Sequence, residues 1–216
     1  MRNTVLFGPV IQTMFFFAAA GIVVLEVFYI MLFLMVVAQQ YFYERDNPGL
    51  KVFDTKMYSV GALPQQVVAG ALIGVAIGAP LIAFGHPAVV HVDEWVKQTF
   101  FVGFVETYLL VVFVETTYVG RFHAGPFIWP FFFASLHPAV RTVWMAGRFT
   151  WASLVAFAYA ASFGVLFYSL YEARNRLSER RSRWFGAVTS WTTHVTVNMI
   201  VITFALSIMG TVMLPL

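Results

Sequence analysis

Long apolar stretches with few charges between them constrain the fold of this chain more than any other feature. Most of them reach the roughly 20 residues that an α-helix needs to cross a bilayer. Of the 216 residues, 60% are hydrophobic and 11% are charged, whereas soluble domains carry about 25% charged residues. The sequence therefore predicts an all-α, polytopic membrane protein with a single membrane domain. The six expected helices cover residues 10–39, 64–84, 96–118, 126–140, 150–170 and 185–213.

The basic residues are distributed unevenly between the two faces that six spanning helices would create. The arginine-rich loop at 171–184 lies on a face that carries nine lysines and arginines, against four on the opposite face. Because loops rich in lysine and arginine stay in the cytoplasm, we expect loop 171–184 to be cytoplasmic and both termini to lie outside. The expected location is a prokaryotic plasma membrane.

Composition also limits the chemistry and the partners that are expected. The chain has no cysteine, which excludes disulfides, thiolate catalysis and cysteine-ligated zinc. The net charge is only +3 and the histidines are scattered without an HExxH motif, so we expect no nucleic-acid partner, no metal and no cofactor. The expected partners are membrane lipid and a membrane-associated peptide or protein, and the oligomeric state is left open.

Four polar residues within the apolar stretches indicate a candidate site: Glu106, His137, His194 and Asn198. An ionisable side chain costs about 2.5–3.5 kcal/mol at the centre of a bilayer, so its presence there needs a reason. His194 and Asn198 are four residues apart, which places both on one helix face, where they could stabilise one developing oxyanion. Glu106 is a candidate general base for water.

A structural interpretation of each of these residues stays open. His137 could bond a backbone carbonyl freed by a nearby proline, and Glu106, His194 and Asn198 could each bond a neighbouring helix. Glu115 lies on the opposite face of its helix from Glu106, so the two do not form a carboxylate dyad. The roles of Glu115 and Glu26 are left open.

Two short motifs resemble those of the CaaX protease and bacteriocin-processing (CPBP) family of intramembrane glutamic endopeptidases. The segment from Phe133 to His137 reads FASLH and matches the family motif FxxxH. The segment from His194 to Asn198 reads HVTVN and matches the motif HxxxN. Glu106 stands where the first glutamate of the motif EExxxR is expected, and the resemblance covers residues 96–213, four of the six expected helices.

The resemblance implies a metal-independent endopeptidase that cleaves a membrane-associated peptide or protein tail. In it Glu106 and His137 would activate a water molecule, while His194 and Asn198 would hold the oxyanion. The first motif departs from the family pattern, because Thr107 and Val111 replace its second glutamate and its arginine. An inactive CPBP-like protein that serves in binding, assembly or immunity is therefore an alternative, and a haem protein with His137 and His194 as axial ligands is a less favoured one.

Overall fold

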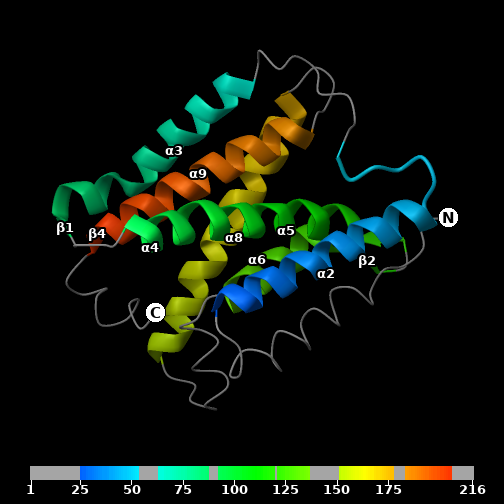
Figure 1. Cartoon of the computed structure of the whole chain (residues 1–216), viewed down its shortest axis with the longest axis horizontal. Helices are drawn as coiled ribbons and strands as arrows, with labels where there is room; N and C mark the ends of the chain where they lie inside the picture. The colour runs from blue at the N-terminus through cyan, green and yellow to red at the C-terminus, as the bar shows by residue number, and fades with distance from the viewer. Residues whose placement is uncertain are drawn as a thin grey trace. The chain divides into compact units, whose positions relative to one another are not determined.

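The computed structural model describes residues 25–53, 63–87, 92–119, 121–136, 151–177 and 183–205 (Figure 1). Helices make up most of these residues, which confirms the all-α class. The described residues also contain two short strand pairs, in which each strand is two residues long. The helices are α2 (Leu25–Asp46), α3 (Leu63–Phe84), α4 (Val92–Val96), the π-helix η2 (Lys97–Val102), α5 (Gly103–Thr116), α6 (Gly125–Leu136), α8 (Trp151–Leu177) and α9 (Arg183–Thr203); the strands are β1 (His86–Pro87), β2 (Tyr118–Val119), β3 (Phe122–His123) and β4 (Phe204–Ala205).

One helix within the described residues, α3, is long and apolar enough to cross a membrane. Its bounds agree with the expected helix at 64–84. Its packed side consists of glycines, because Gly70, Gly74 and Gly78 are buried, whereas large side chains such as Leu72 and Val75 are exposed.

The chain divides into two compact units, each built from two separate stretches of sequence. The first unit contains residues Met1–Val52 and Tyr108–Tyr168, and the second contains Phe53–Thr107 and Ser169–Leu216. The helices α5 and α8 each begin in one unit and end in the other.

In the first unit, the second half of α5 forms a core with α6 and the start of α8. Leu109, Val112 and Phe113 are almost completely buried, and the ring of Phe113 stacks on that of Phe132 with centroids 4.7 Å apart. The indole of Trp129 donates a hydrogen bond to the carbonyl oxygen of Gly164 at 3.1 Å. Aromatic rings thus fill the space between these helices, which explains the abundance of phenylalanine in this part of the chain.

In the second unit, α3 and α9 pack closely along the glycine side of α3. A Cβ atom at Gly70 would lie 2.6 Å from the carbonyl oxygen of Thr189, so only glycine allows this approach. The hydroxyl of Thr193 donates to the carbonyl oxygen of Gly70 at 3.1 Å, and the hydroxyl of Thr189 donates to the Gln66 side chain at 3.0 Å. Threonine hydroxyls on α9 therefore supply side-chain hydrogen bonds across this contact, where the glycines of α3 have no side chain.

Four helix ends within the described residues differ from the expected positions. The helix expected at 96–118 ends at Thr116, because Tyr118 belongs to strand β2, which pairs with β3. Helix α2 continues past residue 39 to Asp46, where the Asn47 side chain bonds the carbonyl oxygen of Tyr43 at 2.8 Å. Helix α8 continues to Leu177, so the first part of the predicted loop 171–184 is helical. Helix α9 ends at Thr203, because the next two residues pair with β1 in an antiparallel register instead of continuing the helix. Residues 1–24 and 206–216, where other predicted helical positions fall, lie outside the described residues.

Candidate functional site

Glu106 and His194 meet inside the second unit. The Nε2 atom of His194 lies 3.2 Å from the Oε2 atom of Glu106, and each side chain is only 6% exposed. Two of the four predicted site residues are therefore brought together, although they come from α5 and α9. Both were singled out from sequence because they are polar residues in apolar stretches.

The backbone around Glu106 is shaped for close approach to α9. The π-helix η2 ends immediately before Gly103, the first residue of α5. A Cβ atom at Gly103 would lie 3.2 Å from the Cγ2 atom of Val195, so the missing side chain lets the start of α5 come close to α9. Because π-helical turns change the rotational register of a helix, η2 helps to set which face of α5 carries Glu106 toward His194.

Asn198 is half-buried and lies one turn beyond His194 on the same face of α9. His137 lies outside the described residues. Phe133, the other end of its motif, is buried in the first unit, where its ring meets that of Phe167 edge-on at 5.7 Å.

The two positions that depart from the first family motif are both buried. Thr107 is 5% exposed and Val111 is completely buried. An arginine at the position of Val111 would need a buried partner for its charge, so valine suits this apolar environment.

The buried contact restricts what Glu106 and His194 can do chemically. Removing two charges from water costs free energy that a single contact repays only with good geometry, and this contact places an imidazole nitrogen within reach of a carboxyl oxygen. Such a pair can accept a proton from a water molecule and return it to a leaving group. Within the described part of the chain, no group of three or more acidic, histidine or cysteine side chains is arranged to hold a metal ion.

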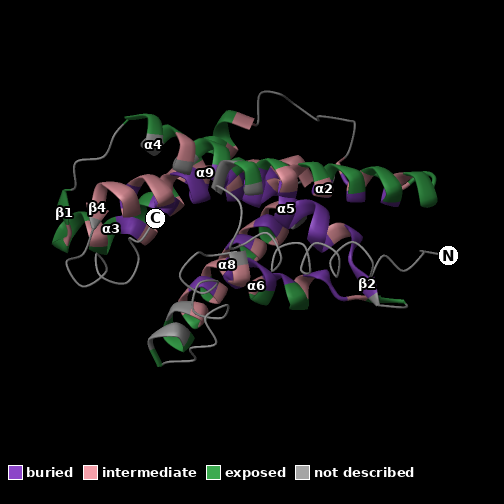
Figure 2. Ribbon diagram, turned by 60° about the horizontal axis from the view of Figure 1, so that its bottom comes forward, coloured by how far each residue is buried: buried purple, intermediate pink, exposed green. Residues whose placement is uncertain are grey.

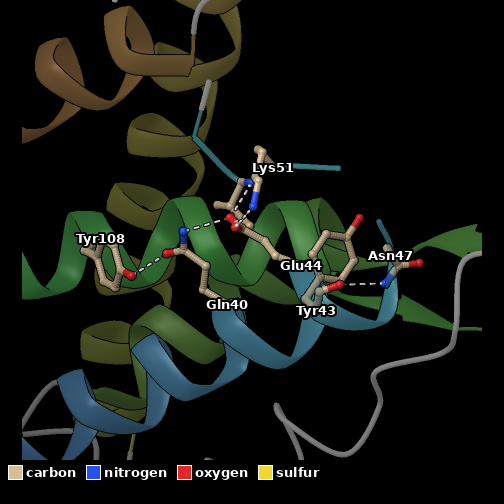
Figure 3. Close-up of polar contacts among 7 residues, drawn as sticks. Gln40, Tyr43, Glu44, Asn47, Lys51 and Tyr108 are labelled. Atoms are coloured by element: carbon tan, nitrogen blue, oxygen red, sulfur yellow. Dashed lines mark hydrogen bonds and ion pairs between the residues drawn. The ribbon is translucent and has the colours of Figure 1, made fainter. Parts of the chain in front are cut away.

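A second polar network, which sequence reasoning missed, lies in the first unit at the end of α2 (Figure 3). The Tyr108 hydroxyl donates to Oε1 of Gln40, whose Nε2 donates to Oε1 of Glu44 at 2.9 Å. Glu44 also accepts from the backbone N–H of Val52 and from the Lys51 ammonium, both at 3.0 Å. The spacing of Gln40 and Glu44 was a signal, because residues four apart in a helix face one another.

The electrostatics of this network centre on the Glu44 carboxyl. Burial raises the pKa of Glu44, but the hydrogen bonds from Val52, Gln40 and Lys51 together outweigh burial and hold the pKa below its ordinary value of 4.5. The network thus fixes the turn after α2 through a carboxylate that is ionised at neutral pH.

The chain was compared with family models, curated proteins and solved structures. No family model matches the chain, and no match was found among curated proteins or solved structures.

Proposed function

We propose that this chain is an integral membrane endopeptidase of the glutamic type, in which Glu106 activates a water molecule for attack on a peptide bond. The observation that carries the proposal is the buried contact of 3.2 Å between Glu106 and His194. The polar row continues with Asn198, in the order that the resemblance to the CPBP family implies. The substrate is a membrane-associated peptide or protein tail.

The proposed reaction needs no group beyond the chain and water. The water oxygen bonds to the peptide carbonyl carbon while one water proton moves to Glu106. The carbonyl oxygen becomes negative and accepts hydrogen bonds from His194 and Asn198. Glu106 then gives its proton to the peptide nitrogen as the carbon–nitrogen bond breaks, which restores the carboxylate. His137 would assist Glu106, as the family pattern implies.

The exposed apolar surface supports a membrane location with several spanning helices. On α2, the exposed residues include Ile30, Leu34 and Val37, which recur at helical spacing. Figure 2 shows exposed positions, in green, along this helix. On α3, glycines form the packed side and large apolar residues form the exposed side. Helices of soluble proteins bury their large apolar side chains and expose polar ones. Helices in lipid instead expose large apolar side chains and place small residues where helices contact one another.

The test of catalysis uses purified protein in lipid vesicles with a library of fluorescence-quenched, membrane-inserting peptides. We expect Glu106→Gln to abolish cleavage, because an amide of the same shape cannot take a proton from water. Asn198→Ala should lower turnover about 10²–10³-fold, the usual effect of removing one oxyanion donor. Glu115→Gln, a change on the same helix outside the site, is the matched control and should retain cleavage. Addition of a chelator should change nothing.

A binding protein without catalysis is the second candidate, and the replacement of two motif residues by Thr107 and Val111 favours it. In that case Glu106→Gln and Asn198→Ala would leave the biological role intact. The haem alternative is less well supported, because the His194 Nε2 atom contacts Glu106.

Orientation in the membrane is tested with cysteines, since the chain has none of its own. We expect a maleimide that cannot cross membranes to label Ser178→Cys from the cytoplasmic side only. Asp93→Cys, at an exposed position of helix α4, should react only from the opposite side. Labelling of both from one side would refute the proposed orientation.

A further inference from the structure

Two buried polar atoms, on residues that neighbour Glu106 and His194 along their helices, have no hydrogen-bond partner within the described residues. They are the hydroxyl oxygen of Thr107, which follows Glu106 on α5, and the indole nitrogen of Trp191, which lies one turn before His194 on α9. Buried polar groups are nearly always bonded to protein or to ordered water, so two such atoms near one site indicate a bound polar group.

The packing of α5 against α9 places these two residues in one layer. In Figure 1, α9 runs toward β4, at the end of the second unit where α4 and η2 lead into α5, so α9 and the start of α5 run in opposite directions. Gly103 of α5 lies against Val195 of α9. Thr107 lies one turn after Gly103 on α5, and Trp191 lies one turn before Val195 on α9. Because the helices run in opposite directions, both residues lie at the same level along the contact, one turn from Gly103 and Val195.

We propose that Thr107 and Trp191 hold a single water molecule against Glu106, and that this is the water activated in the proposed reaction. The indole N–H can only donate, so it bonds a lone pair of the water oxygen. One O–H of the water donates a hydrogen bond to the Thr107 hydroxyl oxygen, and the other donates to the Glu106 carboxylate. The second lone pair of the water is left to face the carbonyl carbon of a substrate.

This arrangement makes Thr107 and Trp191 positioning residues, and it rests on the proposed function only in its catalytic part. A carboxylate accepts several hydrogen bonds, so Glu106 can contact His194 and the water at the same time. Because each proton and lone pair of the water has an assigned partner, loss of either positioning residue should disturb the water without removing the base.

The first measurement is independent of cleavage. Ultraviolet resonance Raman spectra of the full chain in lipid vesicles report whether an indole N–H is hydrogen-bonded, and the difference between wild type and Trp191→Phe isolates the signal of Trp191. In the wild type we expect the Trp191 band of a hydrogen-bonded indole N–H. In Thr107→Val this band should shift toward that of a free N–H, and in Thr107→Ser it should remain that of a bonded one. Thr117→Val, which removes another buried hydroxyl without a partner in the described residues, is the control and should leave the Trp191 signal unchanged.

The second measurement is cleavage of the same peptide library. We expect Thr107→Val and Trp191→Phe each to lower kcat about ten- to a hundredfold, with little change in KM. This loss is no larger than the lower end of the effect of removing one oxyanion donor. Thr107→Ser should restore most of the activity, which a purely structural role would not require. A free indole signal in the wild type, or a bonded one that ignores Thr107→Val, would overturn the water site. A bonded, Thr107-dependent signal without cleavage would uphold the site and refute the proposed function instead.

Discussion

His194 on α9 reaches Glu106 on α5 across the interior of one compact unit, with 3.2 Å between Nε2 and Oε2. The contact joins two residues that are far apart in the sequence, and both side chains are withdrawn from solvent. Because the contact offsets part of the cost of burying both side chains, we expect the pair to stabilise the fold as well as to form the proposed site.

The first prediction concerns this pair. His194→Ala removes the imidazole that contacts the buried Glu106 side chain, so we expect a loss of about 3–5 kcal/mol in the free energy of unfolding. The double variant Glu106→Leu/His194→Leu removes both polar groups and should be considerably more stable than His194→Ala. Chemical unfolding in detergent measures both. Equal stability of His194→Ala and wild type would show that the contact does not stabilise the fold.

The second prediction concerns two adjacent threonines at the end of α5. Gln39 donates to the Thr116 hydroxyl at 2.6 Å, and this hydroxyl donates to the carbonyl oxygen of Val112, also at 2.6 Å. Thr116→Val removes the acceptor of the buried hydrogen bond from Gln39, so we expect a loss of about 1–3 kcal/mol in the free energy of unfolding. Thr117→Val removes a buried hydroxyl that has no partner in the described residues, and it should be neutral or stabilising. The difference between the two unfolding midpoints is the measurement.

The third prediction concerns the close contact of α3 with α9. A Cβ atom at Gly74 would lie 2.6 Å from the Cβ atom of Thr196, so Gly74→Ala must push the helices apart. We expect a cost of about 1–3 kcal/mol, as for overpacking of a core. Ala76→Val adds bulk on the exposed side of the same helix and should cost little. If both variants unfold at the same midpoint, the glycines are not needed for packing.

The fourth prediction concerns acid stability. The network around Glu44 lowers its pKa in the folded state, so its stabilising effect is present above the ordinary value of 4.5 and is lost as the pH falls through the lowered folded pKa. Glu44→Gln should therefore remove part of the loss of stability that wild type shows in this acidic range. Thermal unfolding between neutral and acidic pH is the measurement, and Asp46→Asn is the control. An unchanged acid profile in Glu44→Gln would assign the effect to other carboxyls.

The sequence alone was sufficient for the helical class and for several helix positions, because long apolar runs and their polar ends depend on local composition. Helix α3 shows this best: its expected range, 64–84, differs from Leu63–Phe84 by one residue at its start. The sequence also singled out Glu106 and His194, because an ionisable residue in an apolar stretch is visible without any structure.

The contacts between distant segments could not be predicted in this way. The end of α9 at Thr203 depends on pairing with His86 and Pro87, and the apolar run of α9 contains no signal for that partner. The polar bond from Gln39 to Thr116 likewise depends on which face of α2 meets α5.

Within the described residues, the sequence by itself therefore determined which segments contain helices, and it singled out Glu106 and His194. Only the tertiary structure decided that the side chain of Glu106 meets that of His194. The physical reason is that helix formation follows from interactions a few residues apart, whereas the rotation and register of two packed helices follow from side-chain shapes such as the missing side chain of Gly103 against Val195.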